Sequence, residues 1–473
     1  METLIQPHIT LMKDEEQYAL VHRAALRVLA ETGVRVDSPS VLKRLKHAGQ
    51  VQVQDRVVKM PAEFVESAIH SAPHRIELFD RRGSPAFTMG DGSMRFGIGV
   101  TALSYLDPVT GVPEPFERRH VRDMTRLGGA LPNYDVVSTV GVPRDVHPDL
   151  SDLYTALDMI SHTTKPLVIL VSDETRFPAV MDLFEALTGD LAAKPYVIPY
   201  FNPVSPLVYN AGTLDKMTVC LERGLPFILS SYSMAGMSSP MTPAGILALL
   251  MAELLGGLAI AQALKPGAPV SLGILPNYFD MQTMQSFYDP QSILLNLACG
   301  DMMAHYGIPH CGTSGSGTGW GTDFISADTY WMNTLTFSLM RGGLAPFVGD
   351  TLGAKAFAPN TVVYVHEVID QARRIAAGFR LDEASSVLDE IAAAGPGGSF
   401  LSSPTTKRLY KTGYYKSPVW RRWSMEKWEG EGRPEADKLL REHTAALLKS
   451  APAPDDCEEL MRKGEERIGK LSR

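Results

Sequence analysis

Aromatic and neutral polar side chains gather in five segments, each directly after a short apolar run. These segments are 200–203 (YFNP), 230–237 (SSYSMAGM), 276–280 (PNYFD), 310–323 (HCGTSGSGTGWGTD) and 347–350 (FVGD). They contain no Lys or Arg, and their three acids, Asp280, Asp323 and Asp350, lie on separate segments. The missing basic residues argue against phosphate binding, and nothing in the sequence pairs two acids for hydrolysis by paired carboxylates.

Aromatic faces with a single carboxylate nearby suit a quaternary ammonium ion. The methyl groups of such a cation are not ordinary hydrogen-bond donors, so the cation is held by the electron-rich faces of aromatic rings. A second interpretation stays open, because aromatic side chains at these positions also fill protein cores.

The glycine-rich segment 312–319 (GTSGSGTG) differs from phosphate-binding loops in its pattern. It lacks the lysine of GKS and GKT loops, and its glycines do not match GxGxxG at the start of a helix. Because glycine leaves the backbone uncovered, this segment instead suits the close approach of a large flat partner.

The spacing of His and Cys predicts no metal site. His305 and His310 lack a third ligand in register, HExxH is absent, and the four cysteines form no CxxC. We therefore expect a structural or substrate-contacting role for His310. The methionines 237, 241, 281 and 284 either line a soft apolar mouth or fill the core, and the usual role of Met favours the core.

These segments must be positioned by a regular set of strands and helices. Eight short apolar runs, with starts about 25 to 45 residues apart, each precede Pro, Gly, Ser or Asn and then a helical segment. The runs are 96–102, 136–142, 167–171, 196–200, 227–231, 270–275, 308–312 and 345–349. Their number predicts an α/β fold, a (β/α)8 TIM barrel, in which the reactive site lies at the C-terminal ends of the strands. A doubly wound open sheet is the alternative, although GxGxxG does not follow the first run.

Helical patterns flank the barrel segments at both ends. Residues 15–32, 39–48 and 61–72 predict an N-terminal accessory layer, and the charged, helical segments after residue 360 predict a C-terminal extension. We therefore divide the chain into 1–94 as the accessory segment, 95–360 as the barrel and 361–473 as the extension.

Composition restricts the class of protein. The 473 residues carry a net charge of -8, which argues against a nucleic-acid-binding protein. The N-terminal residues do not have the pattern of a signal peptide, and the cysteine pattern excludes a disulfide scaffold, so we expect a cytoplasmic protein. The apolar segment 243–264 is long enough to span a membrane, but Glu253 near its middle favours a buried helix.

The sequence resembles the trimethylamine methyltransferase family, and within it the members that lack pyrrolysine. The resemblance covers nearly the whole chain and depends on the order and spacing of several short segments. They are 29–34 (LAETGV), 61–72, 305–309 (HYGIP), 321–328 and 395–401 (GPGGSFL).

This resemblance implies an enzyme that moves a methyl group from a methylated amine to the Co(I) of a separate corrinoid protein. No cofactor is then tightly bound, since the cobalamin is carried by the partner. Because pyrrolysine is absent from this sequence, trimethylamine is in doubt, and quaternary amines such as glycine betaine are the expected substrates. A quaternary ammonium ion releases a neutral tertiary amine, so its demethylation requires no metal or general acid.

Strand-end positions supply the candidate site residues. Asp323 is the candidate catalytic residue, as an electrostatic or orienting group. The candidate substrate-binding residues comprise cage aromatics (Phe201, Tyr232, Tyr278, Trp320, Phe347) and donors for a carboxylate (Asn202, Asn277, His310, Lys355). Gly312, Ser314, Gly315 and Gly317 are the candidate positions facing the corrinoid.

Other functions are left open by the sequence. The same chemistry on proline betaine, carnitine or butyrobetaine would preserve the mechanism, whereas a non-catalytic binding protein for quaternary amines would bind a betaine without methyl transfer. We expect no nucleic-acid or membrane partner, and a homo-oligomer is possible.

Overall fold

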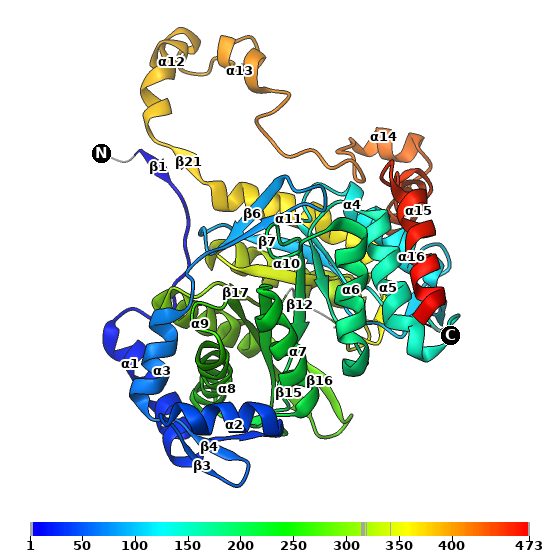
Figure 1. The fold of residues 1–473 in the computed structure, drawn as a ribbon. Helices are drawn as coiled ribbons and strands as arrows, with labels where there is room; N and C mark the ends of the chain where they lie inside the picture. The colour runs from blue at the N-terminus through cyan, green and yellow to red at the C-terminus, as the bar shows by residue number, and fades with distance from the viewer. Residues whose placement is uncertain (1–2, 314–316, 318, 341, 472–473) are drawn as a thin grey trace.

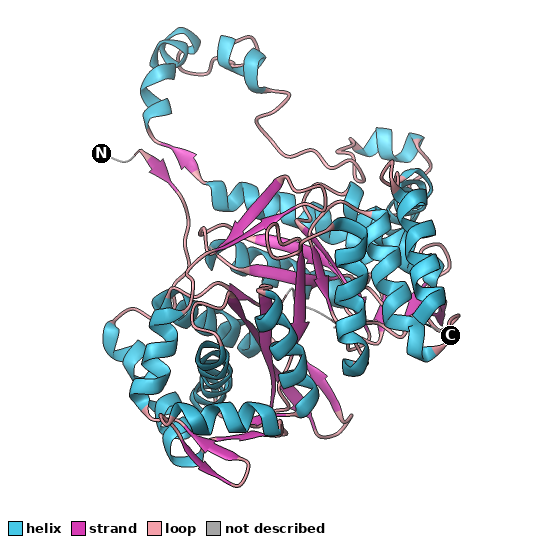
Figure 2. Ribbon diagram, viewed as in Figure 1, coloured by secondary structure: helices cyan, strands magenta, loops and turns pink. Residues whose placement is uncertain are grey.

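The computed structural model describes residues 3–313, 317, 319–340 and 342–471. Its centre is a closed barrel of parallel strands, in which the last strand, β18, pairs with the first, β7, and β14 pairs with β15 (Figure 2). The barrel strands are β7 (Arg95–Ile98), β10 (Val136–Ser138), β11 (Leu167–Ile169), β12 (Val197–Phe201), β14 (Phe227–Ala235), β15 (Val270–Asp280), β17 (His310–Cys311) and β18 (Leu344–Val348). Each overlaps one of the eight predicted runs, so the predicted (β/α)8 barrel is confirmed.

One long helix follows each barrel strand and covers the outside of the barrel (Figures 1 and 2). Gly or Pro at the ends of several of these helices sets their limits, since Pro fits the first turn and Gly the left-handed position after the last. The eight helices are α4 (Arg118–Ala130), α5 (Pro148–His162), α6 (Phe177–Thr188), α7 (Ala211–Arg223), α8 (Pro243–Leu264), α9 (Pro290–Tyr306), α10 (Phe324–Met340) and α11 (Pro359–Ala377).

Helix α8 is the apolar segment that is long enough to span a membrane. In the fold, 83% of its most apolar stretch is buried. Its inner side packs on β14 and β15, and its outer side is covered by the N-terminal helices α1 (Glu15–Arg27), α2 (Pro39–Ala48) and α3 (Ala62–Ser71). A helix enclosed on all sides must be apolar on all sides, which explains its composition.

Inward-facing side chains of the strands fill the barrel interior, and a hairpin closes its N-terminal end. The hairpin of β5 (Ile76–Phe79) and β6 (Pro85–Met89) contributes Ile76, Leu78 and Met89 to the same apolar cluster as the inward-facing strand residues Ile198 and Leu344. In the described part of the chain, the C-terminal end of the barrel therefore stays open.

A separate sheet and a hairpin of the barrel sheet wall this open end. On one side lies a four-stranded sheet of β8 (Ser104–Leu106), β9 (Pro113–Pro115), β19 (Asp350–Thr351) and β20 (Ala356–Phe357). On the other side, the long strand β15 turns back into β16 (Gln285–Phe287).

The predicted layers on both sides of the barrel are present. Strands β2 (Val34–Val36), β3 (Gln52–Gln54) and β4 (Val57–Lys59) accompany the N-terminal helices, and β13 (Val208–Tyr209) completes their sheet. At the other end, α15 (Ala436–Ser450) packs on α11 and α4, and α16 (Cys457–Leu471) packs on α5 and α6. The division at 94/95 and 360/361 stays a prediction, and the eighth barrel helix, α11, spans the second boundary.

Candidate functional site

A cavity of about 750 Å³ opens at the C-terminal end of the barrel. Its floor comes from strand ends, including Leu170, Tyr200 and Leu275. Its walls come from the separate four-stranded sheet and from the β15–β16 hairpin, including Ser104 and Phe287. This is the position where (β/α)8 barrels carry their sites.

Aromatic rings make up much of the lining. Two of them, Tyr200 and Phe347, lie edge to face with their centroids 5.0 Å apart. The hydroxyl of Tyr232 donates to Ser286 Oγ at 2.8 Å, which ties strand β14 to β16 across the cavity wall. The aromatic residues of the lining are Tyr200, Tyr232, Phe287, Tyr288, Trp320 and Phe347.

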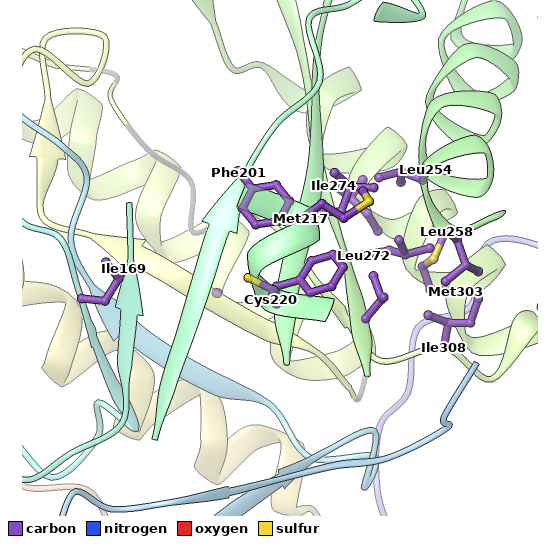
Figure 3. Packing of buried hydrophobic residues seen from close by; sticks show 14 of the residues in the cluster. Ile169, Phe201, Met217, Cys220, Leu254, Leu258, Leu272, Ile274, Met303 and Ile308 are labelled. Atoms are coloured by element: carbon purple, nitrogen blue, oxygen red, sulfur yellow. The ribbon is translucent and has the colours of Figure 1, made fainter. Parts of the chain in front are cut away.

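Three of the five predicted cage aromatics line this cavity: Tyr232, Trp320 and Phe347. Phe201 lies on the outside of the barrel, where its ring stacks on Phe227 at 5.2 Å and points toward Met217 and Cys220 of α7 (Figure 3). Tyr278 is buried in the outer core, with its ring 6.1 Å from that of Phe287.

Alternation along β12 explains why Tyr200 occupies the place expected for Phe201. Successive strand residues point to opposite faces, so Ile198 and Tyr200 face the barrel interior while Val197 and Phe201 face the helices. Tyr200 was missed, although the same alternation was readable in the sequence. Burial raises the pKa of Tyr200 well above its ordinary value, so its hydroxyl stays protonated.

The lining contains one acid and one base among the described residues, Asp280 and Lys355. The pKa of Asp280 is lowered because its carboxylate accepts from the Gln282 N–H at 2.9 Å and the Thr283 hydroxyl at 2.7 Å. Asp280 is therefore an ionised carboxylate at the mouth, a position we had expected Asp323 to fill. Lys355, a predicted donor, has an exposed side chain at the same mouth.

Asp323 lies outside this cavity and directly precedes helix α10. Its Oδ1 accepts from Ser326 N at 2.9 Å and its Oδ2 accepts from Trp320 N at 2.8 Å. In return, the N–H of Asp323 donates to Ser326 Oγ at 3.0 Å. These bonds cap the helix and hold Trp320, which does line the cavity.

The predicted amide and imidazole donors lie at different depths. Asn202 lines the cavity, and in the amide orientation that suits its neighbours it donates to the Ser230 carbonyl at 3.0 Å. Asn277 is fully buried on the same face of β15 as Leu275, and its amide finds no hydrogen-bond partner among the described residues. His310 begins strand β17 at the closed end of the barrel, and burial lowers its pKa to about 4.

At its described positions, the glycine-rich segment contacts neighbouring helices and loops of the barrel. Gly312 is buried, and a Cβ there would lie 2.8 Å from both Asn296 and Phe337. Gly317 lines the cavity with a left-handed φ of +82°, and its carbonyl accepts from Gly353 N at 2.9 Å. Ser314 and Gly315 lie outside the described residues, and their role toward the corrinoid stays a prediction.

The four methionines at the strand ends do not fill the core. Met237, Met241, Met281 and Met284 are 60–69% exposed, so the core interpretation is wrong. Met241 and Met281 approach each other across Gly236, where a Cβ would lie 3.2 Å and 3.5 Å from them. They form a soft apolar rim beside the cavity mouth.

Among the described residues, no three His, Cys, Asp or Glu side chains lie together as metal ligands would. The absence of metal from the reaction stays a prediction. The described lining supplies aromatic rings, the amide of Asn202 and the two charges at the mouth.

Comparisons with known proteins agree on one family. Residues 3–462 match the family described as trimethylamine methyltransferase (MTTB). The chain is 26% identical over 450 residues to the trimethylamine methyltransferase MttB of Desulfitobacterium hafniense strain DCB-2, covering 93% of this chain and 90% of that one. It is also 26% identical over 440 residues to a glycine betaine methyltransferase of D. hafniense strain Y51, covering 89% and 90%.

A solved structure supports the fold. The monomethylamine methyltransferase (MtmB) of Methanosarcina barkeri superposes with a TM-score of 0.54 at 11% identity, over 94% of this chain and 89% of that one.

Proposed function

The chain belongs to the trimethylamine methyltransferase family, and from this premise we propose that it moves a methyl group from a quaternary amine to the Co(I) of a corrinoid protein. The observation that carries the proposal is the cavity lining, in which six aromatic residues accompany a single carboxylate, Asp280, and a single base, Lys355, among the described residues. Aromatic faces hold a methylated ammonium ion without needing hydrogen bonds from it.

The reaction balances without a proton. The carbon–nitrogen bond breaks with its electron pair going to nitrogen, while Co(I) of the second substrate supplies both electrons of the new carbon–cobalt bond. The products are a neutral tertiary amine and a methyl-Co(III) corrinoid.

The residues of the chain supply position and exclude water. Tyr200 and Phe347, held edge to face, and Tyr232, fixed by Ser286, would orient one methyl group toward the mouth. Leu170 and Leu275 keep the floor apolar. Because the positive charge on nitrogen decreases in the transition state, the cage must bind the cation only moderately, which a site with one acid at its rim satisfies.

Glycine betaine is our specific proposal for the substrate. The relative named glycine betaine methyltransferase supports it, as does Lys355 at the mouth of the cavity. The ammonium group of Lys355 would bind a carboxylate of the substrate. The exposed methionines 237, 241, 281 and 284 suit the docking of the corrinoid protein at the same end of the barrel.

The test combines the purified protein, a Co(I) corrinoid protein and glycine betaine. We expect dimethylglycine by mass spectrometry and a methyl-cobalt absorption spectrum, with both signals reduced in Tyr200→Ala. Product from another quaternary amine but none from glycine betaine would change the substrate. Binding of betaine by calorimetry with no methyl transfer to any reduced corrinoid would replace the enzyme with a binding protein.

A further inference from the structure

Residues 379–414 form an arm that leaves the body of the protein. The arm begins after α11 at β21 (Phe379–Arg380), which pairs with β1 (Leu4–Ile5), and continues through α12 (Leu388–Ala394) and α13 (Pro404–Leu409). In Figure 1 it projects above the barrel, whereas β16 at the cavity mouth lies below. Neither α12 nor α13 contains a buried residue.

The arm exposes apolar side chains along its whole length. Helices of six and seven residues are too short to be stable alone in water, so this segment needs a packing partner to hold its shape. The nine large apolar side chains, each 44–86% exposed, are Phe379, Leu381, Leu388, Ile391, Phe400, Leu401, Leu409, Tyr410 and Tyr414.

This exposed area is large enough for a stable interface. Since a large side chain buries roughly 200 Å² when covered completely, nine half-exposed ones offer about 900 Å² per copy. A stable complex takes about 800 Å² from each partner.

The charges of the arm identify the partner. Its outgoing half, 379–394, carries four acids and one Arg, a net charge of -3. Its returning half, 404–414, carries Lys407, Arg408 and Lys411 and no acid, a net charge of +3. The two halves already touch within one arm, where Glu390 Oε1 accepts from the Thr405 hydroxyl at 2.6 Å. A strongly acidic or basic partner would still repel one half, whereas a second copy related by a two-fold axis places each half against the complementary half of the other arm.

We propose that two copies of this chain associate through their arms, the acidic half of each against the basic half of the other, with the apolar side chains buried between them. Because the arm and the cavity mouth lie at opposite ends, the pair leaves both mouths open to a partner protein (Figure 1).

Charge reversal tests the proposal on the full-length protein. Glu383, Asp389, Lys407 and Lys411 are exposed, so replacing them leaves the core intact. By light scattering after size exclusion, we expect the native protein to be a dimer at low micromolar concentration. E383K/D389K and K407E/K411E should each raise the dimer dissociation constant roughly tenfold or more, and the quadruple variant should recover the dimer.

Leu401→Asp provides an independent apolar test, since Leu401 is 86% exposed and its loss should weaken the dimer without lowering the melting temperature of the monomer. A native protein that is monomeric throughout the micromolar range would overturn the proposal. So would a dimer that persists in Leu401→Asp, a quadruple variant that fails to recover, or a larger assembly that does not depend on the arm.

Discussion

The carboxylate of Glu253, near the middle of helix α8, accepts a hydrogen bond from the Ser231 hydroxyl of strand β14. The same carboxylate accepts from Ser205 Oγ and from the Leu207 N–H, each at 2.8 Å. One acid in an otherwise apolar helix therefore anchors the loop after β12 and the strand β14, from which the cavity receives Asn202 and Tyr232.

Replacing Glu253 tests this anchor. Burial raises the pKa of Glu253, which favours its protonated form, so Glu253→Gln should lower the free energy of unfolding by only about 1 kcal/mol. Glu253→Leu leaves two hydroxyls and an N–H without an acceptor, and should lower it by about 3 kcal/mol. Denaturant unfolding measures both, and equal stability of the two variants would contradict the anchor.

Tyr200 and Phe201 are neighbours with opposite roles. Tyr200→Ala removes a ring from the cavity and should raise the dissociation constant of the quaternary amine roughly tenfold. Because Tyr200 is also buried, the same change should lower the free energy of unfolding by about 3 kcal/mol. Phe201→Ala opens a hole between β12 and α7 and should lower the free energy of unfolding by about 3 kcal/mol, with binding to the folded protein unchanged. Calorimetry and denaturant unfolding of both variants measure this contrast, and the reverse result would place the wrong residue in the cavity.

The sequence predicted the fold better than the site because the two depend on different information. The eight barrel strands follow from short apolar runs at a regular pitch, a local signal. Which side of a strand faces the cavity depends on register, and choosing Phe201 over Tyr200 was an error of one residue.

Other site residues depend on turns and on distant contacts. Asp323 follows a strand in the sequence, but it caps α10, because the helix begins at the next residue. His310 stands at the start of β17 rather than at its end, so it lies far from the mouth. The β15–β16 hairpin brings Asp280 and Phe287 to the cavity. The positions of the strand ends alone do not predict this hairpin.

Lys355 should distinguish substrates by their carboxylate. Lys355→Met removes the one base of the described lining, so kcat/KM for glycine betaine should fall roughly tenfold. Choline has the same ammonium group and no carboxylate. With choline as substrate, kcat/KM should therefore change less than about twofold. Lys355→Arg should retain most activity on glycine betaine. Equal losses for both amines would show that Lys355 does not bind the carboxylate.

His310 should make stability depend on pH. Its pKa is about 4 in the folded protein and near its usual 6.5 in the unfolded chain, so the unfolded chain binds more protons between these values. The stability contribution is complete above pH 6.5 and is lost as the pH falls toward 4, by at most about 3 kcal/mol.

The matched variant for this effect is His310→Gln, which cannot titrate there. Its stability relative to the native protein should rise as the pH falls from 6.5 to 4, while the shared titrations of His120 and His162 cancel. Parallel pH profiles of the two proteins in denaturant unfolding would contradict the assignment.

Asp323 is best tested as a positioning residue that acts through Trp320. Asp323→Ala removes the acceptor of both Ser326 N and Trp320 N, so we expect a loss of about 1 kcal/mol in stability and a mobile Trp320. Ser326→Ala is the control, because it removes the reciprocal bond to Asp323 N and leaves the Trp320 bond in place. Both variants should lower the melting temperature, but only Asp323→Ala should raise KM and change the fluorescence of Trp320. The Trp320 signal is obtained by subtracting the spectrum of the same protein carrying Trp320→Phe. A fall in kcat with unchanged KM and fluorescence would instead place Asp323 in the methyl-transfer step itself, as an electrostatic group.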